Sequence, residues 1–343
     1  MEAGDRVFLT GGTGFIGTHL LEKLVARGCR VRALARRDHP EPPPGTLRNP
    51  WADEHVELIR GELEDSDCLK RAMDGCRWAF HLAGYAKNWS PDPETYRRLN
   101  IEATCRILDL ARELGLERVV WTSSLVTFGP TRRGEVGDER MPRITDRFFT
   151  EYEASKYEAE RRALEYAAKG VPVVITNPTR VFGPGHLTEG NSVTRLIDDY
   201  DRGRLPVLLN RGVNMGNYVL ASDVAEGLVL AMENGRVGER YILGSENVTL
   251  KEFFRLVDRA SGKRHFQIPL FKFAPMVFAY FQQWRAEWFG VYPQITPGWM
   301  RTFMADWAFS CDKARDELGY RPTPLAEAVR LTYEWLRSVR GKE

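Results

Sequence analysis

Residues 10–17 read Thr-Gly-Gly-Thr-Gly-Phe-Ile-Gly and follow a short apolar run at residues 6–9. The glycines at positions 11, 14 and 17 have the spacing GxxGxxG, and helical periodicity follows over residues 18–27. In such a strand, turn and helix, the first glycine permits the tight turn and the second lets the backbone approach a pyrophosphate. The third lets the helix pack on the sheet, and the helix N–H groups then face the phosphates. The segment therefore predicts a dinucleotide-binding loop, with a glycine turn without ligand as the alternative.

Apolar strands and helical patterns alternate through the first half of the chain. Further strands are expected at residues 30–35, 56–60, 78–82, 118–123 and 171–176. Helices are expected at residues 66–73, 95–114 and 150–169. Repeated βα units of this length predict an α/β fold with a doubly wound, parallel Rossmann sheet. We expect a dinucleotide-binding domain over residues 1–176. A smaller, mixed substrate-binding domain is expected over residues 177–343, with some segments returning to the first domain.

Composition narrows the class of protein. The chain has 343 residues and a formal net charge of +2 at pH 7, which gives no reason to expect a nucleic-acid partner. Five cysteines are scattered without a CxxC pair, so neither a disulfide framework nor a metal site is expected, and free thiols fit a reducing cytoplasm. No signal-peptide pattern opens the sequence, and the longest apolar stretch, residues 268–281, is shorter than the ~20 residues of a bilayer span. We expect a cytoplasmic protein without a transmembrane segment.

The end of the second expected strand selects between the two nicotinamide dinucleotides. A ribose 2′-hydroxyl prefers an acidic partner at this place, whereas a 2′-phosphate prefers arginine. The strand ends in Ala35-Arg36-Arg37, with no carboxylate before Asp38. Because Arg36 and Arg37 offer charge-assisted bonds to phosphate, the sequence favours NADP(H) over NAD(H). Two arginines that only solubilise a loop are the alternative.

Tyr152 and Lys156 are four residues apart in an expected helix, so they share a face. A lysine ammonium and a nicotinamide cation nearby would lower the pKa of the tyrosine from its reference value near ~10. Tyr152 could then exchange a proton with a substrate oxygen. Ser124 follows the fifth strand, where strand ends form the ligand crevice, and its hydroxyl could hold the same oxygen. A surface pair without function is the alternative for Tyr152 and Lys156.

In their order along the chain, these motifs resemble extended short-chain dehydrogenases/reductases, the NAD-dependent epimerase/dehydratase superfamily. The resemblance rests on TGGTGFIG at 10–17, HLAG at 81–84, NIEAT at 100–104, TSS at 122–124, YEASK at 152–156 and NPTRVFGPG at 177–185. It continues through NYV at 217–219, DVA at 223–225 and YRP at 320–322, and so covers almost the whole chain.

The resemblance implies roles for individual residues. Tyr152 would be the acid/base, Lys156 would bind the nicotinamide ribose and tune Tyr152, and Ser124 would orient the substrate. The expected cofactor contacts are Gly11, Thr13, Gly14, Phe15, Ile16, Gly17, Arg36, Arg37, Glu62, Leu63, Leu82, Ala83, Gly84, Asn100, Thr122, Tyr152, Lys156, Asn177, Pro178 and Val181. Glu62 departs from the family's usual Asp by one methylene. A structural role is the alternative for His81, as a packed histidine, and for Asn177, as a turn cap.

Two subgroups of this family compete for the reaction. Nucleotide-sugar epimerases and dehydratases often carry an arginine where this chain has Gly216, aligned on the DVA motif, and dehydratases place acids where it has Leu125 and Val126. The segment more closely resembles dihydroflavonol-reductase-like and 3β-hydroxysteroid-dehydrogenase-like members, which act on apolar alcohols and ketones. We therefore predict an NADP(H)-dependent oxidoreductase that interconverts a hydrophobic ketone and a secondary alcohol.

Two alternatives remain open. A nucleotide-sugar epimerase or dehydratase would need its missing charge from Arg180, Arg195 or Arg211. The second alternative is a non-catalytic NADP-binding sensor. Such sensors can lack the Tyr/Lys pair, whereas this chain keeps it as Tyr152 and Lys156.

Aromatic residues gather near the C-terminus and suggest an apolar wall for the substrate, with ordinary core packing as the alternative. The expected wall residues are Phe271, Phe273, Phe278, Tyr280, Phe281, Trp284, Trp288, Phe289, Tyr292 and Trp299. Lys272 and Arg285 interrupt these aromatics, so peripheral contact with a membrane surface is a further interpretation. The expected partner is a small, hydrophobic substrate, and the pattern is compatible with a homodimer.

Overall fold

The protein is built around a seven-stranded sheet in which all neighbouring strands are parallel. The computed structural model describes residues 1–38, 40–45, 49–87, 89–271 and 273–340. Across the sheet the strands are β10 (Arg240–Leu243), β6 (Val173–Pro178), β5 (Arg118–Thr122), β4 (Trp78–His81), β1 (Arg6–Thr10), β2 (Arg30–Ala35) and β3 (Val56–Arg60). The expected doubly wound Rossmann sheet is confirmed. Its order reverses between β1 and β4, and ligands bind at the carboxyl ends of strands beside such a reversal.

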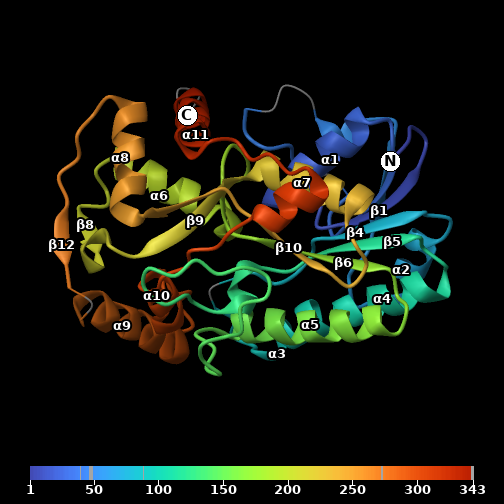
Figure 1. Cartoon of the computed structure of the whole chain (residues 1–343), viewed down its shortest axis with the longest axis horizontal. Helices are drawn as coiled ribbons and strands as arrows, with labels where there is room; N and C mark the ends of the chain where they lie inside the picture. Colours follow the sequence, from blue (N-terminus) through green and yellow to red (C-terminus); the bar gives the residue numbers. More distant parts are fainter. Residues whose placement is uncertain (39, 46–48, 88, 272, 341–343) are drawn as a thin grey trace.

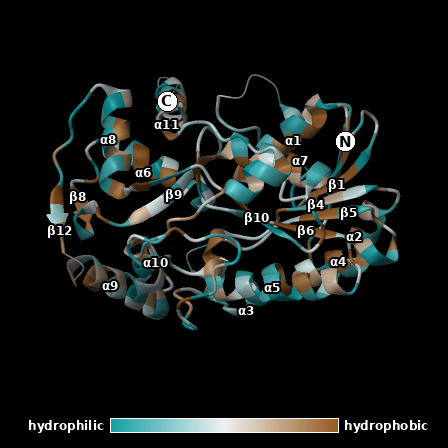
Figure 2. Ribbon diagram, in the orientation of Figure 1, coloured by the Kyte–Doolittle hydropathy of each residue, from teal (hydrophilic) through white to brown (hydrophobic). Residues whose placement is uncertain are grey.

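Helices cover both faces of this sheet (Figure 1). On one face lie α1 (Phe15–Ala26) and α7 (Ala221–Asn234), which pack on each other. On the other face lie α2 (Ser66–Met73), α4 (Ala103–Glu113) and α5 (Glu151–Ala168), with the short α3 (Glu94–Tyr96) beside them. A separate buried cluster fills each face, and Figure 2 shows the hydrophobic strands β4, β5 and β6 between helices with hydrophilic outer surfaces. The result is a three-layer α/β body.

Short helical turns join several of these elements. The 3-10 turns span Pro50–Ala52, Leu125–Phe128, Glu189–Asn191 and Asn210–Gly212, and the π-helical turns span Arg97–Glu102 and Ala314–Leu318. The expected helix at residues 95–114 is therefore divided among α3, the π-helical turn at Arg97–Glu102 and α4.

A smaller region lies beside the carboxyl ends of the strands (Figure 1). One of its sheets contains β11 (Glu246–Thr249), β9 (Met215–Leu220) and β7 (Arg180–Phe182), and the other pairs β12 (Ile268–Leu270) with β8 (Val207–Leu209). Its helices are α6 (Ser192–Asp201), α8 (Leu250–Ser261), α9 (Phe273–Phe289), α10 (Pro297–Phe303) and α11 (Leu325–Arg340). A third buried cluster joins α6, α8 and α11 to β7 and β9. Strand β10 returns from this half of the chain to the edge of the large sheet.

The expected aromatic wall is wrong for nine of its ten residues. Those nine side chains are exposed, from Tyr292 at 41% to Phe273 at 79%, and Trp299 alone of the ten lines the cleft described below. The reason lies in the face that α9 turns inward. Its buried positions include Pro275, Ala279, Gln282 and Ala286, which share one helical stripe. Small and polar residues thus occupy the buried stripe, and the seven expected wall residues on α9 occupy its other faces, while Phe271 and Tyr292 lie outside this helix.

The lengths and apolar character of the described helices bear on whether the chain could cross a membrane. None of them is both long and apolar enough to pass through a bilayer. Lys272, which the sequence placed among the aromatics of a membrane-contacting stretch, lies outside the described residues.

Candidate active site

The glycine loop between β1 and α1 is so closely packed that side chains are excluded. A Cβ atom on Gly11, whose φ is +77°, would lie 2.6 Å from the backbone nitrogen of Ala83. A Cβ atom on Gly17 would lie 1.9 Å from the carbonyl oxygen of Gly11. Gly14 caps α1 without a side-chain hydrogen bond, so no side chain competes for the first N–H groups of the helix. This cradle fits a dinucleotide phosphate at a helix N-terminus.

A cleft opens beside this loop and contains the predicted catalytic residues. Its volume is about 260 Å³. Ser124, Tyr152 and Lys156 line this cleft. The aromatic residues Trp299, Phe303 and Trp307 line it as well. Besides Tyr152 and Lys156, six predicted cofactor residues line it: Ile16, Leu82, Gly84, Thr122, Pro178 and Val181.

Helix α5 places Tyr152 in its first turn. Thr150 caps the helix by accepting a hydrogen bond from the backbone nitrogen of Glu153. The ring of Tyr152 stacks on Trp299, with centroids 6.0 Å apart. Burial raises the pKa of Tyr152, and its hydrogen bond with Ser124 opposes that rise. Without cofactor, the pKa therefore moves in the opposite direction to the sequence-based expectation, because burial outweighs the neighbouring groups.

Lys156 is buried one turn further along α5. Its Nζ donates to the carbonyl oxygen of Thr122 at 2.8 Å and lies over the ring of Trp121. Burial lowers the pKa of Lys156 to about 8, and the charge of Glu160 acts against this shift. The hydroxyl of Thr122 is buried at the same place without a hydrogen-bond partner among the described residues. The ammonium and this hydroxyl fit the hydroxyl groups of a cofactor ribose.

Sequence reasoning missed Glu160, the acidic residue beneath this pair. Its Oε2 accepts from Ser123 Oγ at 2.6 Å, from Thr127 Oγ1 at 3.0 Å and from Asn177 Nδ2 at 2.7 Å. Its Oε1 accepts from Arg240 Nη1 at 3.1 Å. The i, i+4 spacing from Lys156 was a usable signal, since it puts both residues on one helix face. The network joins β5, β6, β10 and α5 directly below Ser124.

Asn100 and His81 hold the loop after β4 in place. Asn100 accepts from the backbone nitrogen of Tyr85 at 2.6 Å and donates to Ser155 Oγ at 2.9 Å. His81 is 1% exposed and lies between the hydroxyls of Thr10 and Thr104. Burial lowers the pKa of His81 to about 3. Its placement agrees with the alternative of a packed, neutral histidine, and Asn100 connects the loop to α5.

The remaining predicted cofactor residues surround the cleft without lining it. Arg36, Arg37 and Glu62 are exposed beyond the ends of β2 and β3, and neither arginine has an ion-pair partner within 4.0 Å among the described residues. Leu63 is half-buried against the second core cluster. Phe15 is 5% exposed, and the side chain of Asn177 is fully buried in the Glu160 network. The others in this group are Gly11, Thr13, Gly14, Gly17, Ala83 and Asn100.

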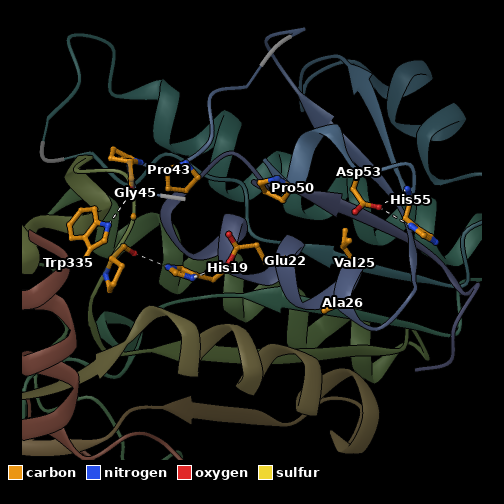
Figure 3. Close-up of a pocket in the computed structure, with 13 residues that line it drawn as sticks. His19, Glu22, Val25, Ala26, Pro43, Gly45, Pro50, Asp53, His55 and Trp335 are labelled. Carbon is orange, nitrogen blue, oxygen red and sulfur yellow. Dashed lines mark hydrogen bonds and ion pairs between the residues drawn. The ribbon is translucent and has the colours of Figure 1, made fainter. Parts of the chain in front are cut away.

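A second hollow is lined in part by residues of α1 (Figure 3). Its volume is about 690 Å³, and His19, Glu22 and Trp335 are among its lining residues. The side chains of His19 and Trp335 are engaged with backbone oxygens of Pro184 and Pro44, and His55 pairs with Asp53. The smaller cleft is the candidate active site, because it alone of these two hollows holds Ser124, Tyr152 and Lys156.

Comparison with known proteins agrees with this geometry. Residues 7–244 match the model of the NAD dependent epimerase/dehydratase family. A protein of Synechocystis sp. whose assignment as a dihydroflavonol 4-reductase is provisional is 30% identical over 97% of this chain and 95% of its own. A 4-hydroxy-2-methyl-3-oxo-4-farnesyl-3,4-dihydroquinoline-1-oxide ketoreductase of Stigmatella aurantiaca is 30% identical over 92% and 91%. The crystal structure of gox2253 superposes with a TM-score of 0.81 at 34% identity, covering 98% of both chains.

Proposed function

Because the chain belongs to the NAD-dependent epimerase/dehydratase family, and so is an NAD(P)-dependent enzyme of the extended short-chain dehydrogenase/reductase type, we propose that it interconverts a hydrophobic ketone and a secondary alcohol with NADP(H). One observation carries the proposal. Ser124 and Tyr152 share a small cleft with the aromatic residues Trp299, Phe303 and Trp307. Polar groups that fix one oxygen, set among apolar side chains, are what an apolar carbonyl substrate needs.

The residues of this chain supply proton transfer and orientation. A bound nicotinamide would deliver the hydride to the carbonyl carbon. Ser124 donates a hydrogen bond that holds the carbonyl oxygen beside Tyr152. Tyr152 then donates its phenol proton to that oxygen. Because its pKa is raised by burial, Tyr152 is protonated at neutral pH, as the reduction direction requires.

Lys156 has a double role in this proposal. Its ammonium binds the ribose hydroxyls, and its positive charge favours the phenolate that forms when Tyr152 gives up its proton. Glu160 keeps the ammonium charged. The expected cofactor contacts of the glycine loop, including Thr13, Phe15 and Ile16, belong to the same proposal, as do Glu62, Leu63 and Ala83 near the adenine and its ribose.

NADP(H) is preferred in this proposal because Arg36 and Arg37 are exposed beyond β2 and have no ion-pair partner among the described residues. Both are therefore available to a 2′-phosphate.

The division into a cofactor domain over residues 1–176 and a mainly substrate-binding domain over residues 177–343 belongs to the proposal, as does a cytoplasmic location that keeps the five free cysteines reduced.

The alternative is a nucleotide-sugar epimerase or dehydratase. The cleft volume of about 260 Å³ lies just below the ~300–1,000 Å³ of typical ligand pockets, and the nicotinamide ring must share it. A compact ketone therefore fits this cleft more readily than a nucleotide sugar does. A ketoreductase that acts on a farnesylated quinoline oxide is among the relatives of this chain, which also supports a carbonyl substrate.

We further propose that α9 contacts an anionic membrane surface. Five of its aromatic side chains, Phe273, Tyr280, Phe281, Trp288 and Phe289, are at least half exposed. Residues 262–303 contain five basic residues and one acidic residue, a net charge of +4 in a chain of net charge +2. Aromatic residues with a local basic charge are typical of segments that lie in the lipid interface.

A substrate panel tests the proposed reaction. Purified enzyme is mixed with NADPH and, separately, with apolar aryl and alkyl ketones and with steroid-like and flavonoid-like ketones. UDP- or GDP-sugars are supplied with NAD⁺ or NADP⁺, because epimerisation and dehydration both begin with oxidation of the sugar. We expect NADPH oxidation with apolar ketones. Conversion of a nucleotide sugar without net reduction of the supplied NAD⁺ or NADP⁺, together with no activity on any ketone, would establish the alternative.

A further inference from the structure

Arg180 places a positive charge in the cleft that the mechanism does not use. It begins β7 and lines the same cleft as Ser124 and Tyr152. Its guanidinium lies over the rings of Tyr218 and Phe303, with its carbon 5.5 and 5.8 Å from their centroids. Its Nη1 donates to the hydroxyl of Tyr218 at 3.2 Å. The side chain is thus fixed in position by two aromatic rings and one hydrogen bond.

The charge of Arg180 is not balanced within the described part of the chain. No carboxylate oxygen there lies within 4.0 Å of its guanidinium, although such pairs are common elsewhere in the molecule. Its Nη2 is fully buried and has no hydrogen-bond partner among the described residues. Glu189 is the acidic residue on the cleft wall, and the hydroxyl of Tyr292 donates to its carboxylate. A buried charged donor without a partner is costly, so pairing with an anionic ligand in the cleft is favoured once the guanidinium turns Nη2, which is closed to solvent here, toward it.

Gly216 on the neighbouring strand makes room for this guanidinium. Strand β9 pairs with β7, and Tyr218 is in register with Arg180. A Cβ atom on Gly216 would lie 2.6 Å from Arg180 Nη1 and 2.9 Å from its guanidinium carbon. Any larger residue at position 216 would push the charge out of its present place. Arg180 and Gly216 therefore form one arrangement in which the positive charge comes from β7.

We propose that Arg180 binds a carboxylate on the substrate, so that the substrate is a compact, apolar oxo acid or the matching hydroxy acid. The inference rests on the proposed function for the position of the reacting carbonyl. A planar carboxylate matches the fork of guanidinium N–H groups. One arginine balances one carboxylate, whereas a diphosphate carries at least two charges. Arg180 is thus a specificity-determining residue: it holds one end of the molecule while Ser124 and Tyr152 hold the carbonyl oxygen.

Matched acids and esters test this assignment. The probes are benzoylpropionate and levulinate, each compared with its methyl ester, in NADPH oxidation assays of the full chain. For the wild type we expect kcat/KM to be about ten- to a hundredfold higher for the acid, the size of a hydrogen bond to a charged group. Arg180→Met should remove this preference while ester turnover persists. Arg180→Lys keeps the positive charge but lacks the paired N–H groups of a guanidinium, so it should retain part of the preference for the acid.

The control is Arg195→Met, which removes an exposed arginine on α6 outside the cleft and should keep the full preference for acids. Equal kcat/KM for acid and ester in the wild type, or an unchanged preference in Arg180→Met, would overturn the assignment.

A binding measurement separates this inference from the proposed reaction. If no ketone is turned over, the proposed function fails, but calorimetric titration of the NADP complex with benzoylpropionate and with its amide still decides the role of Arg180. Tighter binding of the acid by the wild type, lost in Arg180→Met or, if that variant does not fold, weakened in Arg180→Lys, supports the carboxylate site. Equal binding of acid and amide by the wild type refutes it.

Discussion

The two walls of the cleft are built on different physical principles. On the wall formed by β5, β6 and α5, the charged groups are held in a hydrogen-bond network: Lys156 bonds to the Thr122 carbonyl, and Glu160 accepts four hydrogen bonds. On the wall formed by β7 and α10, aromatic rings surround Arg180, whose Nη2 has no partner within the described residues. The hydrogen-bond network of Lys156 and Glu160 fixes the geometry of proton transfer. An apolar wall with one unbalanced charge instead selects among molecules.

This contrast separates two kinds of mutation. Substitutions in the wall formed by β5, β6 and α5 should lower kcat or the free energy of unfolding with every substrate. They disturb a hydrogen-bond network whose members hold one another in place. Changes in the aromatic wall should alter which substrate is preferred and leave the chemistry intact.

Tyr152→Phe should have the largest effect on catalysis. Removing the phenol hydroxyl removes the proton donor, and general acid–base catalysis contributes roughly 10²–10⁴-fold. We expect kcat to fall by that factor while the Kd of NADPH changes little, measured by steady-state kinetics and fluorescence titration. Tyr157→Phe on the same helix, where the side chain is exposed, is the control and should keep the wild-type rate. A near-normal kcat in Tyr152→Phe would remove Tyr152 from the mechanism.

Glu160→Gln should have the largest effect on stability. Removing one partner of a buried charge pair costs about 3–5 kcal/mol, and Glu160 also accepts from three neutral donors. Urea unfolding measures the loss. Glu158→Gln, on the same helix with exposed arginine partners, should cost no more than ~1 kcal/mol. Equal losses in the two variants would show that the buried network does not support this wall.

The sequence predicted the catalytic wall of the cleft better than the position of the aromatic residues. Glycine spacing, βα alternation and the Tyr152–Lys156 pair depend on local backbone rules and on i, i+4 geometry, so they predicted the sheet and brought Ser124, Tyr152 and Lys156 into one cleft. The position of the aromatic residues of α9 depends on which stripe of the helix is buried. That stripe is occupied by Ala279, Gln282 and Ala286, and composition alone suggested burial of the aromatics instead. The Glu160 network escaped notice because its partners come from distant strands.

Arg36→Ala tests cofactor preference outside both walls. Losing a charge-assisted bond to the 2′-phosphate should weaken NADPH binding by about 1.5–3 kcal/mol and leave NADH binding unchanged. Titration of both cofactors against wild type and variant measures this. The control is Arg60→Ala, whose arginine already pairs with Asp38. Equal affinity of the wild type for NADPH and NADH would contradict the assignment of NADP(H).

Substitutions on the exposed face of α9 should have a smaller effect, which concerns binding to membrane vesicles. Trp288→Ser and Phe289→Ser each remove an exposed aromatic side chain. Each should weaken co-sedimentation with vesicles of phosphatidylglycerol and phosphatidylcholine by roughly tenfold. Val136→Ser, an exposed apolar residue distant in sequence from α9, should leave binding unchanged. Lack of vesicle binding by the wild type, or concentration-dependent dimerisation through α9, would refute a membrane contact.

The smallest expected effect is a pH dependence of cofactor binding. Because the pKa of Lys156 is lowered to about 8, its ammonium is present below that pH and is lost as the pH rises through it. NADPH affinity should therefore fall by at most about tenfold per pH unit above this value. Lys156→Arg, which stays charged, should bind NADPH without this alkaline decline. A decline of the same size in both proteins would assign it to another group.

Transfer of isotope from cofactor to product tests the central claim most directly. NADPH deuterated on the transferring face of the nicotinamide is incubated with enzyme and an apolar ketone that the substrate panel identifies, and the product is analysed by mass spectrometry and NMR. We predict one deuterium on the new carbinol carbon and one NADP⁺ formed per molecule of alcohol, with the rate of both lowered roughly 10²–10⁴-fold in Tyr152→Phe. Inversion of a nucleotide sugar supplied with NAD⁺ or NADP⁺, without net reduction of that cofactor, and no deuterium transfer from NADPH to any ketone, would contradict the account.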